Sequence, residues 1–304
     1  MKPDLRILLA GVPMKNPVMV ASGTFGYGPE YADLVNLNQL GAIVVKGISL
    51  EPWKGNRTPR LVEVPGGLIN AIGLQNPGVN GFIEKYMPFL RTHDVAVIVN
   101  IWGKTAEEYA EVAARFDGVP GVHALEINIS CPNIKAGGNA FGTNLEATRL
   151  VVSAVRRKTR LPIIPKLAPN VSDIGAFARA CEESGADAIS LINSFPAMAI
   201  DIETRRPILA NVTGGLSGPA IHPIAVKLVY EAAKAVKVPL VAIGGITSAR
   251  EAIEFMIAGA SAVAVGTANF TEPLTAIEVI RGLEEYLCRH NIPNVSDLVR
   301  SLRL

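Results

Sequence analysis

Short runs of continuously apolar residues, bounded by turn-forming residues, recur along the chain and alternate with longer amphipathic stretches. Their length and their β-branched content predict buried strands, and the absence of polar alternation is typical of parallel strands covered by helices. The predicted strands are residues 17–21, 42–46, 95–100, 124–129, 162–167, 187–192, 239–243 and 262–265.

Helical patterns fill the intervals between these strands. The predicted helices are residues 29–38, 78–91, 105–116, 145–158, 172–183, 219–236, 248–258 and 274–289. Ser172-Asp173 and Thr247-Ser248 are start signals, and Glu251 lies in the first turn after the second of them. Gly185 and Gly259 stand just past two of the predicted helices as stop signals.

Eight strands, each followed by a helix, predict an α/β fold of the (β/α)8 TIM barrel type, which usually needs about 250 residues. An open, doubly wound sheet is the alternative. No linker rich in Pro, Gly and Ser divides the chain, so residues 1–304 are expected to form a single domain. Three long connections, residues 48–77, 130–143 and 193–218, follow strands and are expected as insertions on the C-terminal face.

Polar side chains stand at the ends of the first six predicted strands. They are Ser22, Lys46, Asn100, Asn128, Lys166 and Asn193. A polar group at the mouth of an apolar barrel needs a partner, so six of them favour a ligand rich in hydrogen-bonding edges over ordinary loop residues. The last two strands end in Gly244-Gly245 and Gly266-Thr267, where backbone N–H groups can approach a phosphate.

Composition narrows the class of protein. The chain is 49% hydrophobic and 18% charged, which excludes a disordered protein. A net charge of +2 gives no electrostatic footprint for nucleic acid, and no stretch has the roughly 20 apolar residues of a membrane helix. No signal peptide is recognised, and three distant cysteines make neither a disulfide framework nor a metal site. A soluble protein of a reducing compartment, the cytoplasm, is expected.

Cys131 and the two strand-end lysines are candidates for chemistry. Cys131 opens a loop on the expected functional face, where a thiol can accept a proton near neutral pH. Cys181 and Cys288 lie in predicted helices and are interpreted as small core residues. Lys46 and Lys166 could form a Schiff base, bind an anion or stabilise developing negative charge, or simply pack on the rim. The four histidines have no metal-ligand spacing.

Several motifs, in order along nearly the whole chain, resemble those of the dihydroorotate dehydrogenases. They are residues 22–28 (SGTFGYG), Lys46-Gly47, residues 70–76 (NAIGLQN), residues 128–133 (NISCPN), Lys166-Leu167, Ile192-Asn193-Ser194, residues 215–219 (GLSGP), Gly244-Gly245-Ile246 and Gly266-Thr267. The resemblance implies a barrel over residues 1–304 that binds one FMN per chain and oxidises dihydroorotate to orotate in the de novo synthesis of UMP.

The resemblance also implies roles for individual residues. Cys131 would be the general base that takes the C5 proton, while hydride leaves C6 for flavin N5. Substrate would be held by Lys46, Asn70, Ala71, Ile72, Gly73, Leu74, Asn128, Asn133, Asn193 and Ser194. FMN would be held by Ser22, Lys46, Gly47, Asn100, Asn128, Lys166, Ile192, Gly218, Gly244, Gly245, Gly266 and Thr267. A lysine near flavin N1, the implied place of Lys166, stabilises the anionic reduced ring.

The loop of residues 133–142 resembles class 1B, the NAD-linked members, and the Ser base of the membrane-bound class is absent. That class implies a partner subunit carrying FAD and a [2Fe–2S] cluster, in a heterotetramer of two catalytic and two partner chains. No nucleic-acid or membrane partner is expected.

Four other functions stay open from the sequence. A fumarate-linked, class 1A-like enzyme and an FMN barrel of the dihydropyrimidine dehydrogenase type are the near alternatives. A flavin-free Schiff-base aldolase or lyase using Lys166 or Lys46, and a non-catalytic binding subunit, are the distant ones. Basic residues near Lys54, Arg57 and Arg60, and at Arg205-Arg206, are solvated loop residues or steer an anionic substrate or a partner.

Overall fold

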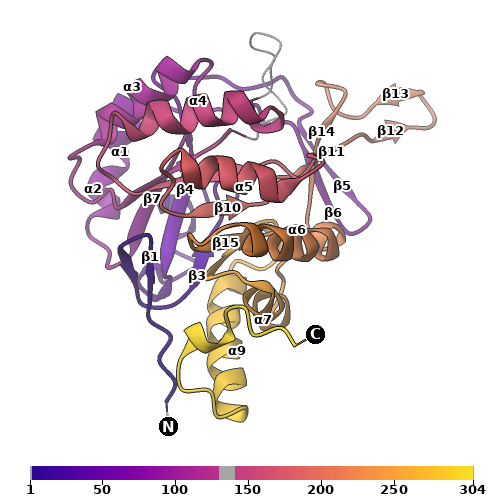
Figure 1. Ribbon diagram of the computed structural model, residues 1–304. Coiled ribbons are helices and arrows are strands. Elements are labelled where there is room, and N and C mark those ends of the chain that lie inside the picture. Colours follow the sequence, from indigo (N-terminus) through magenta and orange to yellow (C-terminus); the bar gives the residue numbers. More distant parts are fainter. Residues whose placement is uncertain (1, 130–140, 304) are drawn as a thin grey trace.

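The computed structural model describes residues 2–129 and 141–303, and within them eight parallel strands close into a barrel (Figure 1). Around the barrel the order is β10, β15, β16, β3, β4, β7, β8 and β9. Their bounds are β3 Val18–Val20, β4 Ala42–Ile48, β7 Ala96–Ile101, β8 Ala124–Ile127, β9 Ile163–Leu167, β10 Ile189–Leu191, β15 Leu240–Ile243 and β16 Ala262–Val265. All eight predicted strands are therefore confirmed, and the closed barrel replaces the alternative of an open sheet.

From β4 onward each barrel strand is followed by at least one α-helix, and these helices cover the outside of the barrel (Figure 1). They are α1 Gly78–Lys85, α2 Met87–Leu90, α3 Ala106–Phe116, α4 Leu145–Arg156, α5 Ile174–Glu183, α6 His222–Ala235, α7 Ala249–Ala258, α8 Ala268–Thr271 and α9 Thr275–Arg289. Asp173 caps α5, and Ser248 and Glu251 form a capping box at α7, as their start signals predict. Gly259 is the C-cap residue of α7, with a φ of 130°.

The helix predicted over residues 29–38 is wrong. That segment holds two short 3-10 turns instead, Pro29–Tyr31 and Leu37–Gln39. The side chain of Asn36 accepts a hydrogen bond from the backbone N–H of Asn38, so it caps the second turn locally. Asn side chains compete in this way with the hydrogen bonds of a continuous helix.

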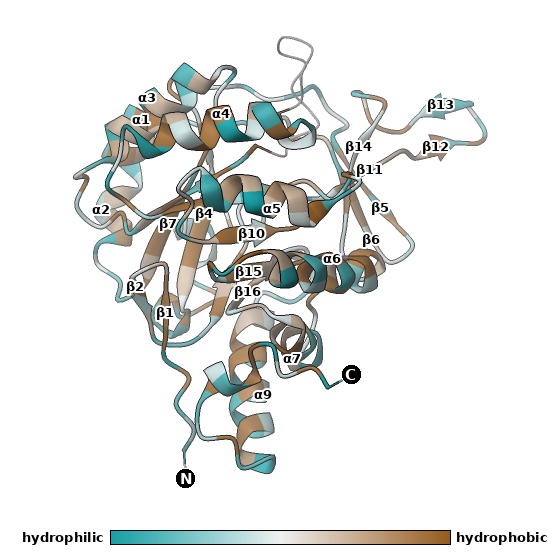
Figure 2. Cartoon of the chain, viewed as in Figure 1, coloured by the Kyte–Doolittle hydropathy of each residue, from teal (hydrophilic) through white to brown (hydrophobic). Residues whose placement is uncertain are grey.

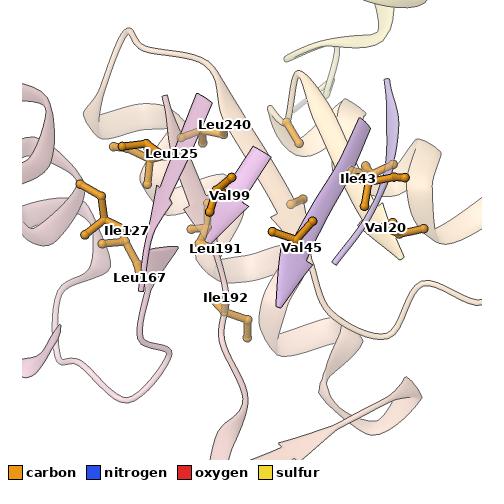
Figure 3. Packing of buried hydrophobic residues seen from close by; sticks show 14 of the residues in the cluster. Val20, Ile43, Val45, Val99, Leu125, Ile127, Leu167, Leu191, Ile192 and Leu240 are labelled. Carbon is orange, nitrogen blue, oxygen red and sulfur yellow. The ribbon is translucent and has the colours of Figure 1, made fainter. Parts of the chain in front are cut away.

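The core of the barrel has two parts, one on each side of its wall. Side chains such as Val45, Val99, Leu125 and Leu191 point out of the barrel and pack with the helices that surround it (Figure 3). Residues at alternate positions, among them Val44, Ile98 and Ile164, fill the interior in a separate cluster. Hydropathy along the ribbons agrees, with apolar strands inside and helices of mixed polarity outside (Figure 2). The barrel is thus packed solid below its mouth.

Two of the long connections join in a second sheet. β5 (Leu61–Val64) and β6 (Gly67–Asn70) come from the first connection, and β11 (Phe195–Ala197) and β14 (Gly214–Ser217) come from the third. They form an antiparallel sheet in the order β11, β14, β6, β5, in which Asn70 pairs with Gly215. This sheet adjoins the C-terminal ends of the barrel strands and confirms that the two connections lie on that face. Most of the connection at residues 130–143 lies outside the described residues.

Two further hairpins were not predicted. β1 (Ile7–Leu9) pairs with β2 (Val12–Met14), and β12 (Ile200–Asp201) pairs with β13 (Arg206–Pro207) on an arm that projects from the second sheet (Figure 1). Within the described part of the chain, no helix combines the length and the apolar character needed to cross a membrane.

Cys288 corrects a sequence-based expectation. Cys181 is fully buried on α5, as expected of a core cysteine, but Cys288 is exposed on α9. Val279, Leu283 and Leu287 form a buried stripe on α9 at four-residue spacing. Cys288 directly follows Leu287 and therefore lies outside this stripe. Both thiols are free.

Candidate active site

Two adjoining cavities open at the C-terminal end of the barrel. The first, of about 480 Å³, is lined by the glycine turns after β15 and β16, and we call it the glycine-side cavity. The second, of about 370 Å³, is lined by Lys46, Gly47, Gly73, Leu74 and Asn128, and we call it the amide-side cavity. Asn70, Lys166, Asn193 and Ser194 line both. The two cavities therefore form one continuous cleft with two chemically different ends.

Backbone forms most of the wall at the glycine end. Gly244 and Gly245 have φ angles of 142° and 68°, and a Cβ atom on Gly245 would lie 2.7 Å from Cβ of His222. Thr267 donates a 2.8 Å hydrogen bond to the hydroxyl of Ser217 across this wall. Such a turn needs glycine, and the backbone N–H groups of glycine turns suit an anion such as a phosphate.

His222, at the first turn of α6, holds this turn from behind. Its Nδ1 lies 3.0 Å from the carbonyl oxygen of Gly244, and its Nε2 lies 3.0 Å from Oε2 of Glu254 on α7. Both partners are acceptors, so each contact is a hydrogen bond when the ring nitrogen that faces it carries the proton. The ring thereby ties the Gly244 turn to two helices.

Side-chain amides and hydroxyls gather at the other end. Asn70 ends β6 and donates to the carbonyl oxygen of Gly215 at 3.3 Å, so the second sheet holds it over the barrel. A Cβ atom on Gly215 would lie 1.9 Å from Oγ of Ser194, which shows how closely these strands approach. Leu74 has a φ of 59°, a strained angle for a non-glycine residue and one that is common at functional sites.

The floor between the two ends is polar and buried. Asn100 and Glu126 are at most 2% exposed, and Lys166 is 5% exposed. The ammonium of Lys166 lies 3.7 Å from Oε2 of Glu126, which also accepts a 3.3 Å hydrogen bond from Asn100. Buried charges are tolerated when they are paired in this way.

Lys46 lies at the amide end beside a second cation. Burial lowers the pKa of its ammonium below the usual range, the nearby guanidinium of Arg60 lowers it further, and Glu30 acts in the opposite direction. Arg60 itself donates to Oε1 of Gln75 at 2.6 Å. Two basic groups at one end of a cavity favour an anionic ligand there.

The structure brings most of the predicted residues to this cleft. The predicted residues that line the glycine-side cavity are Ser22, Asn70, Lys166, Ile192, Asn193, Ser194, Gly218, Gly244, Gly245, Gly266 and Thr267. Those that line the amide-side cavity are Ser22, Lys46, Gly47, Asn70, Ile72, Gly73, Leu74, Asn128, Lys166, Asn193 and Ser194. Asn100 lies buried beneath Asn128. Ala71 is fully buried against Ile69 and Leu209 and lines neither cavity. Cys131 and Asn133 lie outside the described residues.

Sequence reasoning missed several residues of the cleft. Leu68, Ser217 and Phe270 line both cavities, and Glu126 underlies them. Glu126 left a signal in the sequence, because it is a single charged residue in the middle of an apolar predicted strand. Of the first basic group only Arg60 lines the cleft, and Arg206 lies on the exposed arm at β13. Among residues 2–129 and 141–303, no cluster of three or more potential metal ligands is found.

Comparison with known proteins gives a consistent result. A family model described as "Dihydroorotate dehydrogenase" matches residues 4–287. A protein of Geobacter sp. (strain M21), named "Dihydroorotate dehydrogenase B (NAD(+)), catalytic subunit", is 56% identical over 303 residues, covering 100% of this chain and 99% of its own length. A protein of Thermoanaerobacter pseudethanolicus with the same name is 54% identical over 301 residues, covering 99% of each chain.

A solved structure supports the fold. The crystal structure of DHODH from Eimeria tenella in complex with ferulenol aligns with a TM-score of 0.83, covering 98% of this chain and 88% of that one. The two sequences are 23% identical, so this likeness concerns the barrel architecture alone.

Proposed function

The chain belongs to the dihydroorotate dehydrogenase family, and on that premise we propose that it is the catalytic subunit of an NAD-linked enzyme that oxidises dihydroorotate to orotate in the synthesis of UMP. One observation carries the proposal: a single cleft joins a glycine-built end to an end lined by amides and two basic groups. A flavin and a pyrimidine carboxylate need such adjoining sites.

The glycine-side cavity fits FMN. The backbone of Gly244, Gly245, Gly266 and Thr267 would hold the phosphate, because side chains there would fill the cradle. Ser22, Ile192 and Gly218 line the same cavity and would contact the flavin and ribityl parts. Residues 1–304 would thus form a single FMN-binding barrel.

The amide-side cavity fits a pyrimidine carboxylate. Asn70, Asn128 and Asn193 each offer a donor and an acceptor, which is what the edge of a pyrimidine ring requires. Lys46 and Arg60 stand at the same end and would attract the carboxylate. Gly73 and Leu74 would contribute backbone groups, and Asn133 would complete the amide set.

The oxidation removes two hydrogens from adjacent carbons. Bound FMN would accept the hydride from C6 at N5, and the Cys131 thiolate would take the proton from C5 as the C5–C6 double bond forms. Lys166 lines both cavities and would place its ammonium where negative charge develops on the reduced flavin. The role of Cys131 rests on its motif, Asn128-Ile129-Ser130-Cys131-Pro132-Asn133.

The relatives are named catalytic subunits, which supports a separate partner chain. We propose that this partner carries FAD and a [2Fe–2S] cluster, receives the electrons and passes them to NAD, in a heterotetramer of two catalytic and two partner chains.

The test is anaerobic addition of dihydroorotate to the purified yellow protein. NAD and fumarate are then tried as oxidants of the reduced flavin. We expect bleaching of the flavin, release of orotate, and reoxidation by NAD only when the partner subunit is added. Reoxidation by fumarate would assign the fumarate-linked class. Turnover of dihydrouracil but not of dihydroorotate would contradict the proposed substrate. A colourless protein in which borohydride traps the substrate on a lysine would contradict the proposed flavin cofactor.

A further inference from the structure

Glu126 is a buried carboxylate to which the proposed chemistry assigns no role. It lies on β8, two residues before Asn128, and its side chain is 3% exposed. In the strand register it stands directly opposite Asn100 of β7, on the inner face of the barrel. A buried charge destabilises the fold unless it is ion-paired and hydrogen-bonded. The partners of Glu126 therefore indicate its role.

The amides above Glu126 form a chain with one direction. Asn193 donates from Nδ2 to Oδ1 of Asn128 at 3.4 Å, and Asn128 donates from Nδ2 to Oδ1 of Asn100 at 3.4 Å. Asn100 then donates from Nδ2 to Oε2 of Glu126 at 3.3 Å. Every amide passes its donor downward, and the chain ends on the carboxylate.

The carboxylate explains this direction. An ionised carboxylate only accepts, so Asn100 must turn its NH2 group toward Glu126 and its oxygen toward Asn128. Asn128 must then turn its NH2 group toward Asn100 and its oxygen toward the NH2 group of Asn193. Asn128 and Asn193 both line the amide-side cavity. Glu126 therefore fixes the amide orientation of Asn100 and Asn128 although it does not line the cavity itself. The backbone N–H of Ser194, which donates to Oδ1 of Asn193 at 2.8 Å, holds Asn193 in the orientation that continues the chain.

Lys166 is the second partner of Glu126. Its ammonium lies 3.7 Å from Oε2, and the two side chains are 7% and 3% exposed. At such burial the pair is poorly screened, so the carboxylate offsets much of the positive charge that Lys166 offers to the cleft.

We propose that Glu126 is a positioning residue with two effects: it sets the amide orientation of Asn100 and Asn128, from which the chain continues to Asn193, and it moderates the charge that Lys166 offers to the proposed flavin site. This inference deepens the proposed function and rests on it. Glutamine at this position keeps one acceptor oxygen but adds an NH2 group, and the two can exchange places, so Asn100 would no longer be required to donate toward residue 126.

The test compares Glu126→Gln with Glu126→Asp as flavin-loaded proteins. In Glu126→Gln we expect the dissociation constant of orotate to rise about tenfold, the effect of disturbing about one strong hydrogen bond. We also expect the flavin midpoint potential to become more positive, because removal of a nearby negative charge stabilises the reduced flavin anion.

Glu126→Asp separates the two effects. It keeps the charge but withdraws the acceptor by one methylene, so orotate should bind more weakly while the flavin potential stays near that of the unaltered protein. If Glu126→Gln fails to fold, the orotate affinity and flavin potential of Glu126→Asp still test the proposal.

Glu182→Gln is the matched control. Glu182 accepts hydrogen bonds from the backbone N–H groups of Lys237 and Val238, away from the cleft, so neither readout should change. Unchanged orotate affinity in both Glu126 variants, or equal shifts of potential in both, would overturn the proposal. An unaltered protein that binds no flavin or no orotate would instead overturn the proposed function, and this inference with it.

Discussion

Gly47 and Asn100 meet so closely that a Cβ atom on Gly47 would lie 2.7 Å from Oδ1 of Asn100. Gly47 lies one residue before the end of β4 and lines the amide-side cavity, and Asn100 lies fully buried between Glu126 and Asn128. Asn100 cannot yield to an added methyl group without breaking those contacts. The absence of a side chain at Gly47 therefore keeps the amide chain in place.

Gly47→Ala should disturb the cleft without unfolding the barrel. We expect the displaced Asn100 amide to weaken flavin and orotate binding by at least about tenfold, as for the loss of a well-placed hydrogen bond. Flavin content and orotate titration measure this. Gly81→Ala on α1 is the control, since its Cβ would meet only the ring of Pro77, at 3.1 Å and beyond, and it should keep the flavin. Normal binding by Gly47→Ala would contradict the steric argument.

The partly buried ammonium of Lys46 should make the protein less stable at neutral pH while it strengthens the binding of orotate, and both effects should depend on pH. Because its pKa is lowered in the folded protein, the unfolded chain binds more protons between the two pKa values, so this group's contribution to stability rises with pH. Lys46→Met should raise Tm at neutral pH, and the gain should disappear above the ordinary lysine pKa.

The same substitution should weaken orotate binding. In the unaltered protein orotate affinity should fall as pH rises through the lowered pKa of Lys46, because the neutral amine no longer attracts the carboxylate. Thermal unfolding and orotate titration from neutral pH to about one pH unit above the ordinary lysine pKa measure both effects. An affinity in Lys46→Met equal to that of the unaltered protein would remove Lys46 from the substrate site.

His222 predicts a separation of flavin binding from substrate binding. His222→Leu removes the hydrogen bond to the carbonyl oxygen of Gly244 and should raise the dissociation constant of FMN about two- to tenfold, as for one ordinary hydrogen bond. His222→Asn keeps a donor near the position of Nδ1 and should retain more of the affinity. Orotate affinity of the flavin-loaded protein should be unchanged in both. Equal FMN affinities in the two variants would show that the hydrogen bond is unimportant.

Much of the barrel could be predicted because its strands are continuously apolar and its helices carry local signals. Ser248 and Glu251 announce the start of α7 without any tertiary information. The second sheet had no such signal, because Asn70 and Gly215 pair across 145 residues and their strands are short. Pairing of that kind depends on the folded barrel bringing two loops together.

The site was predictable to a similar degree. Strand-end residues such as Lys166 and Asn193 follow from the barrel geometry once the strands are assigned. Glu126 does not, because one charged residue inside an apolar run can be read either as a strand boundary or as a buried partner. Its role became visible only when Asn100 and Lys166 were placed beside it.

Cys131 is expected to control the transfer of the proton from C5 of dihydroorotate rather than the binding of flavin or substrate. Cys131→Ala should keep FMN and orotate binding but reduce flavin reduction by dihydroorotate at neutral pH by about 10²–10⁴-fold, the usual contribution of a general base. Cys131→Ser should recover in part as pH rises, because the less acidic hydroxyl needs a higher pH to accept the proton. Anaerobic stopped-flow bleaching of the flavin measures the rates. Cys288→Ser, an exposed thiol on α9, is the control and should reduce normally. An undiminished rate in Cys131→Ala would assign the proton to another group.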